Sequence, residues 1–110
     1  MFGFFKKKKK RTLLDDLNDA TIEMYRPFLV NNKDLPDDKI LEIVQTAMRA
    51  FTQAAESKGE KISGTVLINI AAKFICVFDQ FGQDFFIEHL QYEIKKYLES
   101  GLRPDYLENK

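Results

Sequence analysis

The sequence predicts an all-α protein, a compact antiparallel four-helix domain that carries a basic N-terminal tail. Four segments place apolar residues at steps of three and four, which is the spacing of one helical face. The links between these segments are short, which favours antiparallel neighbours. The 110 residues include only 5 Gly and 3 Pro, which disfavours a turn-rich β sandwich or barrel.

The first helix is expected over residues 13–25. Thr12 stands before it and Asp15 follows three residues later, which approximates a capping box with Asp in place of the usual Glu. Pro27 closes the helix because it cannot continue the hydrogen-bond ladder. The apolar face comprises Leu14, Leu17, Thr21, Met24 and Phe28.

The second helix begins near Asp37 and Asp38, whose carboxylates suit the positive end of a helix. It should end in the stretch SKGEK, where Gly59 is the expected left-handed cap. The apolar stripe steps by four and three, as in a packed bundle helix. The stripe comprises Ile40, Val44, Ala47, Phe51 and Ala54, with Leu41, Met48 and Ala55 widening it.

The third helix, residues 65–81, is apolar nearly all round and should therefore be buried nearly all round. It either lies centrally under the other helices or is covered by a second subunit, so a homodimer through helices three and four stays open. Asn69 and Lys73 share a narrow polar stripe with Gln80 and could fix the register. Lys73 could instead reach water, or meet Asp79 or a carboxylate from another helix.

The fourth helix, residues 84–100, is ended by Gly101. Its core face is expected to comprise Phe86, Leu90, Ile94, Tyr97 and Leu98. A second stripe, made by Phe85, His89 and Tyr92, lies on a neighbouring face and is our candidate contact with a partner or a second subunit. The expected organisation is a tail over residues 1–11, a four-helix domain over 12–102, and a loosely held C-terminal tail over 103–110.

Catalytic residues are scarce, so we expect no enzyme and no cofactor. The only histidine is His89, and the only cysteine, Cys76, lies within the apolar third helix, where burial makes a thiol unreactive. A single cysteine also forms no internal disulfide. The sequence contains no GxSxG elbow, phosphate-binding loop or paired-cysteine metal motif.

Two weaker sites remain in the sequence. Glu88, His89 and Glu93 are the weak candidates for a metal site, which we do not expect, because the i,i+4 pairs Asp84–Glu88 and His89–Glu93 point about 100° apart. We expect Glu88 and Glu93 to be solvated and His89 to lie at a helix or subunit contact.

An apolar ligand pocket could form among five aromatic residues, although a packed core is the preferred interpretation. These are Phe74, Phe78, Phe81, Phe85 and Phe86.

The N-terminal stretch MFGFFKKKKKR differs from the rest of the chain. Its six cations, residues 6–11, leave 11 basic and 17 acidic residues elsewhere, so residues 12–110 carry a net charge of −6. Aromatic residues beside lysines suit the headgroup region of an anionic membrane. The membrane-contact candidates are Phe2, Phe4, Phe5, Lys6, Lys7, Lys8, Lys9, Lys10 and Arg11.

Other roles for this tail stay open. It could aid solubility alone, dock on the acidic body of its own or a sister subunit, or bind nucleic acid, although the −6 body argues against the last. The charges follow the apolar residues, unlike those of a secretory signal, and Gly3 stands one position late for N-myristoylation. The longest apolar run, residues 66–78, is short for a membrane span. We expect a cytoplasmic protein, and peripheral attachment at the inner face of the membrane stays open.

The combined expectation is a small non-enzymatic interaction or regulatory module. Its helical body would bind an unidentified protein partner or a second copy, and its tail would make weak contact with an anionic membrane surface. A small-ligand or metal-binding bundle is the alternative, and nucleic-acid contact through the tail is the second alternative.

Overall fold

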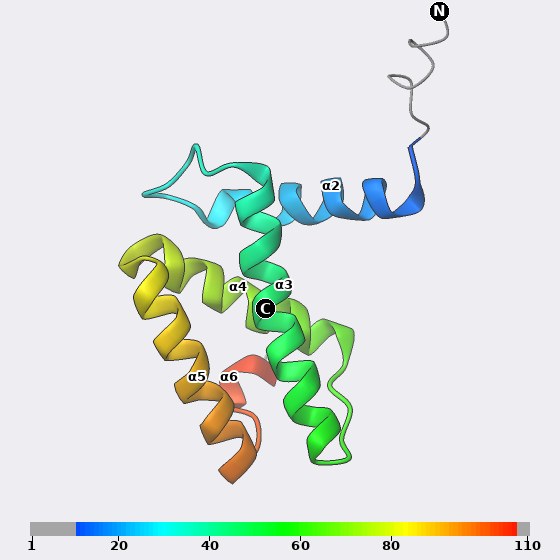
Figure 1. Cartoon of the computed structure of the whole chain (residues 1–110), viewed down its shortest axis with the longest axis vertical. Coiled ribbons are helices and arrows are strands. Elements are labelled where there is room, and N and C mark those ends of the chain that lie inside the picture. Colours follow the sequence, from blue (N-terminus) through cyan, green and yellow to red (C-terminus); the bar gives the residue numbers. More distant parts are fainter. Residues whose placement is uncertain (1–10, 108–110) are drawn as a thin grey trace, which may run out of the picture.

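The computed structural model describes residues 11–107, and all regular structure within them is helical. The expected all-α domain with four long helices is confirmed (Figure 1). The elements in chain order are α2 (Leu13–Tyr25), the 3₁₀ turn η1 (Arg26–Phe28), α3 (Asp37–Ser57), α4 (Gly64–Phe81), α5 (Gln83–Ser100) and the short α6 (Pro104–Leu107).

The helix ends follow from local chemistry. At α2 the capping box forms as expected: the Thr12 side chain accepts from the Asp15 N–H, and the Asp15 side chain accepts from the Thr12 N–H. Ser63 caps α4 by accepting from the Val66 N–H at 3.2 Å. Gly59, just beyond α3, has φ of 73°, so its expected left-handed conformation is confirmed.

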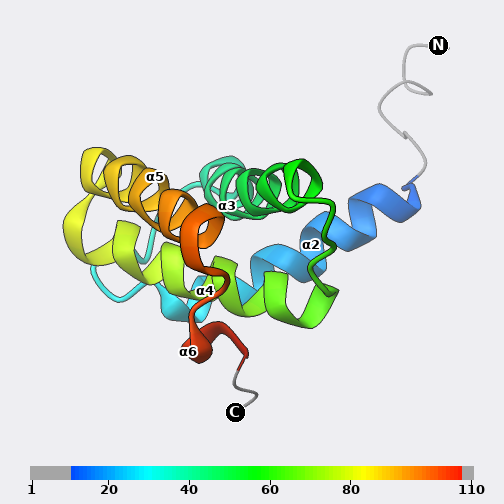
Figure 2. The same cartoon turned by 90° about the horizontal axis from the view of Figure 1, so that it is seen from below.

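The long helices form two layers (Figure 2). α3 and α5 lie side by side in one layer, and α4 crosses beneath both. α2 passes across one end of α3, and its N-terminal part projects away from the other helices (Figure 1). α4 contacts α3, α5, η1 and α6, and is therefore the central helix of the described chain.

The core is organised around the ring of Phe51 on α3. Its centroid lies 6.1 Å from that of Phe74 on α4, 6.0 Å from that of Tyr97 on α5 and 5.8 Å from that of Tyr106 on α6. Offset and edge-on aromatic pairs at such distances stabilise a core beyond the burial of their area. The predicted α3 stripe of Ile40, Val44, Ala47, Phe51 and Ala54 is buried throughout.

α4 is less enclosed than the sequence predicts. Phe74 and Ile75 are fully buried, but Cys76 and Val77 are half-buried and Ile68 is 41% exposed. The expectation of burial nearly all round is therefore wrong, since the neighbours of α4 leave part of its surface uncovered. α4 is long and apolar enough by composition to cross a membrane, a property that it shares with the core helices of many water-soluble domains.

A buried carboxylate fixes the link between η1 and α3. Asp79 on α4 is 5% exposed and accepts from the backbone N–H groups of Val30 (3.0 Å), Asn31 (3.0 Å) and Asn32 (2.9 Å). The side-chain amides of Asn31 and Asn32 also donate to this carboxylate. Burial raises the pKa of Asp79, but these hydrogen bonds outweigh it and hold the pKa below its ordinary value. The link is thereby fixed to the last turns of α4.

We expect Asp79→Asn to lower the free energy of unfolding by about 2–3 kcal/mol at pH 7, because an amide cannot accept from all these donors. A depressed carboxyl pKa contributes stability above its unfolded value of about 4 and loses it as the pH falls through the folded value. The difference between the two proteins should therefore shrink below about pH 4. Urea unfolding of both proteins, from pH 7 to below about pH 4, measures this difference in the free energy of unfolding.

Asp34→Asn is the matched control, because Asp34 is an exposed carboxylate in the same link. It should change the unfolding free energy little. Equal stability of the Asp79→Asn variant and the native chain at pH 7 would contradict the role assigned to Asp79.

Candidate interaction surface

A row of rings, which we name the aromatic ladder, begins at the end of α4 and continues along α5: Phe81, Phe85, His89 and Tyr92. The centroids of Phe81 and Phe85 lie 4.8 Å apart, those of Phe85 and His89 5.7 Å, and those of His89 and Tyr92 6.3 Å. The planes of Phe85 and His89 differ by only 10°, so the two rings stack. The Lys96 ammonium, 5.8 Å from the centroid of Tyr92, extends the row.

Three rings of the aromatic ladder are substantially exposed: Phe81 by 60%, Phe85 by 42% and Tyr92 by 54%. Contiguous exposed rings are uncommon on a monomeric protein and mark surfaces that contact other molecules. The structure thus places the sequence candidates Phe85, His89 and Tyr92 in one continuous surface row. The stripe predicted from the sequence did not include Phe81, because this residue ends α4 and is separated from α5 by the Gly82 turn.

Exposed charges lie beside the aromatic ladder along α5. Asp84 and Glu88 lie in its N-terminal half, whereas Lys95 and Lys96 lie in its C-terminal half together with the acidic Glu99, and all five are exposed. Two copies of α5 placed antiparallel would therefore bring Asp84 and Glu88 of one copy toward Lys95 and Lys96 of the other.

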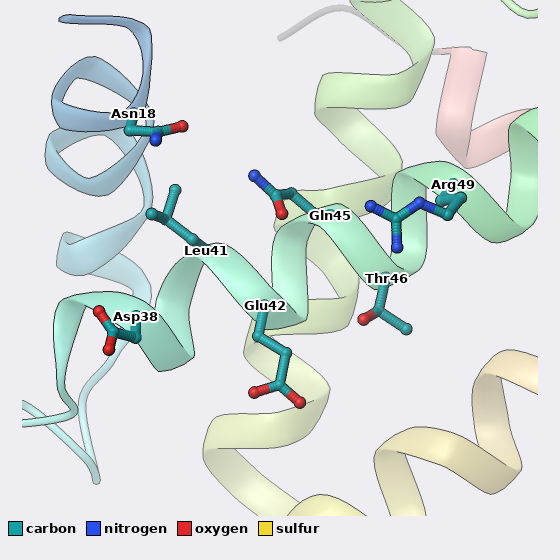
Figure 3. A pocket seen from close by; sticks show the side chains of 7 residues that line it. All are labelled: Asn18, Asp38, Leu41, Glu42, Gln45, Thr46 and Arg49. Carbon is teal, nitrogen blue, oxygen red and sulfur yellow. The ribbon is translucent and has the colours of Figure 1, made fainter. Parts of the chain in front are cut away.

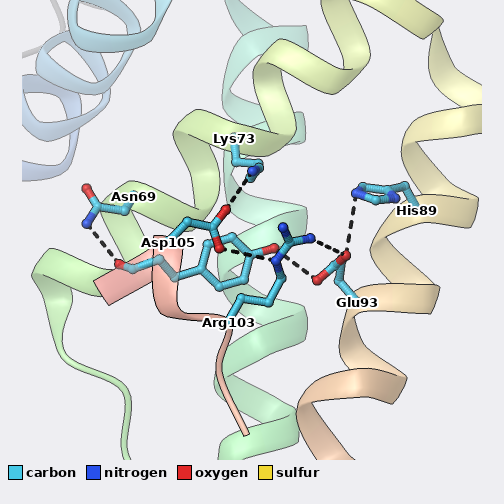
Figure 4. Close-up of polar contacts among 7 residues, drawn as sticks. Asn69, Lys73, His89, Glu93, Arg103 and Asp105 are labelled. Carbon is cyan, nitrogen blue, oxygen red and sulfur yellow. Dashed lines mark hydrogen bonds and ion pairs between the residues drawn. The ribbon is translucent and has the colours of Figure 1, made fainter. Parts of the chain in front are cut away.

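Beneath the aromatic ladder lies a buried carboxylate. Glu93 is 3% exposed, so the expectation that it is solvated is wrong, whereas Glu88 is exposed as expected. The Glu93 Oε2 atom accepts from Arg103 Nη1 at 3.0 Å and lies 3.7 Å from His89 Nε2 (Figure 4). The Tyr106 hydroxyl approaches its other oxygen at 3.4 Å. Arg103 neutralises the charge that burial would otherwise penalise.

Residues 102–107, which we name the C-terminal strap, lie across α4 and α5. Lys73 on α4 pairs with Asp105 at 2.8 Å, and the Asn69 side-chain amide donates to the Tyr106 carbonyl at 3.0 Å (Figure 4). The Tyr106 ring is buried against Phe51. The expectation of a loosely held C-terminal tail is therefore wrong for these residues, because α6 places an apolar ring in the core and its charges on α4.

The metal candidates do not gather at one site. Glu93 and His89 are neighbours, but Glu93 is engaged by Arg103, and Glu88 is an exposed residue of the same helix. Within residues 11–107 no group of three or more His, Cys, Asp or Glu residues is arranged to hold a metal ion. The five aromatic residues proposed for a ligand pocket also separate, since Phe74 and Phe86 are buried core whereas Phe81 and Phe85 face outward.

Cys76 and His89, the residues considered for catalysis, lie on different helices and have different surroundings. Cys76 is half-buried, and burial, followed by the nearby charge of Asp79, raises the pKa of its thiol. The ring of His89 packs against Phe74, Phe85 and Tyr92.

A groove between α2 and α3 is lined mainly by polar side chains (Figure 3). These lining residues include no cysteine or histidine. They are Asn18, Asp38, Leu41, Glu42, Gln45, Thr46 and Arg49.

Among the membrane-contact candidates, Phe2, Phe4, Phe5 and Lys6, Lys7, Lys8, Lys9 and Lys10 lie outside the described residues. Arg11 lies within them and pairs with Asp16 at 3.0 Å and with Asp19. The comparisons with known proteins give no further assignment, since no family model, no curated protein and no solved structure matches this chain.

We expect Arg103→Ala to lower the free energy of unfolding by about 1–3 kcal/mol, because it leaves the Glu93 carboxylate buried without its cation. The C-terminal strap should loosen, so the Tyr106 N–H, which donates to the Arg103 carbonyl, should exchange with solvent faster. Urea unfolding and hydrogen exchange measure the two effects.

Arg49→Ala, which removes an exposed cation from α3, is the control and should change neither quantity. If Arg103→Ala left the exchange of the Tyr106 amide unchanged, the ion pair with Glu93 would not be what holds the strap.

Proposed function

We propose that this chain is a non-enzymatic interaction module that pairs with a second copy through the aromatic ladder and contacts anionic membrane surfaces through residues 2–11. The observation that carries the proposal is the row of rings that runs from the end of α4 along α5, with Asp84 and Glu88 beside its N-terminal end and Lys95 and Lys96 beside its C-terminal end. A surface with this charge order is complementary to itself about a two-fold axis.

The aromatic ladder suits a contact between helices. Phe85, His89 and Tyr92 follow each other at steps of four and three, so they form one straight seam along α5. Aromatic residues are enriched among those that contribute most to binding energy at protein interfaces. The Glu93–Arg103 ion pair beneath the seam keeps α5 and the C-terminal strap together, which gives the partner a preformed surface.

The membrane part of the proposal is supported by the composition of the tail. Each basic residue near an anionic surface contributes about 1 kcal/mol, and aromatic side chains add apolar burial in the headgroup region. Six cations and three phenylalanines within residues 2–11 therefore suffice for reversible, salt-sensitive attachment. The acidic body would remain in solution because like charges repel it from the lipid.

We expect the double variant Phe85→Ser, Tyr92→Ser to weaken self-association about tenfold or more, because it removes two exposed rings from the centre of the interface. Sedimentation velocity over a concentration series measures the dissociation constant. Leu98→Ser is the matched control, since Leu98 is 45% exposed on the same helix but lies off the ladder. A native chain that stays monomeric throughout the series would contradict the pairing.

Co-sedimentation with liposomes tests the membrane contact. The intact chain should pellet with vesicles that contain anionic lipid, should stay in solution with neutral vesicles, and should be released by high salt, which screens the lysines. A chain that lacks residues 2–11 should not pellet. Equal binding of both chains, or binding to neutral lipid alone, would exclude an electrostatic anchor.

A further inference from the structure

A second apolar surface lies on α2, separate from the aromatic ladder. Leu13, Leu17 and Met24 follow each other along one side of the helix and are exposed by 73%, 55% and 47%, and Leu14 beside them is exposed by 63%. Tyr25 is the single buried residue of α2. These exposed fractions show that the described residues leave much of the stripe uncovered, and the N-terminal part of α2 projects from the other helices (Figure 1).

Exposure of this apolar stripe to water leaves α2 with little packing to stabilise it. An isolated helix of 13 residues is marginal in water, and most helical stability in proteins comes from packing of the apolar face. At the N-terminal end of α2 the capping box supplies local support, but it does not bury the leucines. A ligand that covers the stripe would therefore stabilise the helix.

The charge beside the stripe indicates the kind of ligand. Asp16, Asp19 and Glu23 are exposed and follow each other at steps of three and four along the adjacent edge of α2. This acidic edge would repel an anionic membrane. It would also face its own copy in an antiparallel pair of α2 helices, which disfavours self-association here. The surface suits a segment that is both apolar and basic.

The chain carries such a segment directly before α2. Residues 2–10 contain three phenylalanines and five lysines, and the next residue, Arg11, already turns toward α2 and pairs with Asp16 and Asp19. Ten extended residues span about 33 Å, whereas α2 is about 20 Å long, so a returning chain reaches the whole stripe. Attachment to the same chain also gives the segment a high effective concentration at α2.

We propose that α2 is the docking site for residues 2–10 of the same chain, with Phe2, Phe4 and Phe5 covering Leu13, Leu17 and Met24 and the lysines lying along the acidic edge. Arg11 is the first contact of this arrangement. The docking on α2 requires neither the membrane contact nor the pairing through α5, and can be tested independently of both.

The test is paramagnetic broadening in NMR spectra of the full chain. A nitroxide is attached at position 3 of the variant Gly3→Cys, Cys76→Ser, which keeps all three phenylalanines. The amide signals of Leu17 to Met24 should weaken, while those of α5 should not. The further changes Leu17→Ser and Met24→Ser should restore the signals, whereas Leu98→Ser, an exposed leucine on α5, should not.

Broadening confined to the residues that immediately follow the label, and unaffected by the α2 substitutions, would overturn the proposal. A mixture of labelled unenriched chain and unlabelled ¹⁵N chain identifies the donor of the segment. Broadening that persists in this mixture would assign the segment to a sister copy and would likewise overturn docking within one chain.

The docking has a consequence that rests on the proposed membrane contact. If α2 and lipid compete for the same segment, freeing the segment should strengthen binding to anionic vesicles. The variant Leu17→Ser, Met24→Ser should then bind such vesicles several-fold more tightly than the native chain. Equal or weaker binding would exclude the competition. Failure of the native chain to bind vesicles at all would refute the membrane contact and leave the NMR result to decide the docking.

Discussion

The hydrogen bonds to Asp79 are the constraint on which the placement of the N-terminal third of the chain depends. α2 buries little of its own surface, so packing alone does not determine its direction. Asp79 instead fixes residues 30–32 to the end of α4, and Tyr25 donates its hydroxyl to the Ile68 carbonyl at 3.0 Å. These two attachments, 11 residues apart on α4, align α2 across the domain and leave its outer side uncovered.

The polar residues of the apolar helix α4 have a common use, which is to attach segments from elsewhere in the chain. Asn69 and Lys73 bind the C-terminal strap, and Asp79 binds the link before α3. Both ends of the described chain are thus held on one central helix by directional contacts, whereas α3 and α5 pack on it through apolar side chains. A buried polar group is tolerated when it is fully hydrogen-bonded, and these groups also specify which segment binds where.

The sequence predicted the parts of the fold that depend on local spacing. The capping box at Thr12, the α3 stripe and the left-handed Gly59 each follow from residues within a few positions of one another. The sequence did not predict the contacts of Asp79 and Glu93. The hydrogen-bond partners of Asp79 lie 47–49 residues away along the chain, and those of Glu93 lie 10–13 residues away. The residues next to each carboxylate form the pattern of a solvated side chain. The short helix α6 could have been predicted from the stretch LRPDYL, which contains apolar residues and has Pro at the first helical position. In the aromatic ladder, the helical spacing of the sequence identified three of the four rings. Only the structure shows how far each ring is exposed to solvent.

The two exposed apolar surfaces differ in their charges, and this difference assigns them different ligands. Along α5 the N-terminal half exposes only acidic charges, Asp84 and Glu88, whereas the C-terminal half exposes Lys95 and Lys96 together with Glu99, so an antiparallel second copy would bring opposite charges together. The edge of α2 is acidic along its length, so it complements a cationic segment and disfavours its own copy. The chain's excess of positive charge lies in the segment adjoining α2, which accounts for a net charge of zero on the whole chain despite a body of −6. Docking of the tail on α2 would therefore neutralise charge and cover leucines in one step, and would leave the α5 surface free to pair.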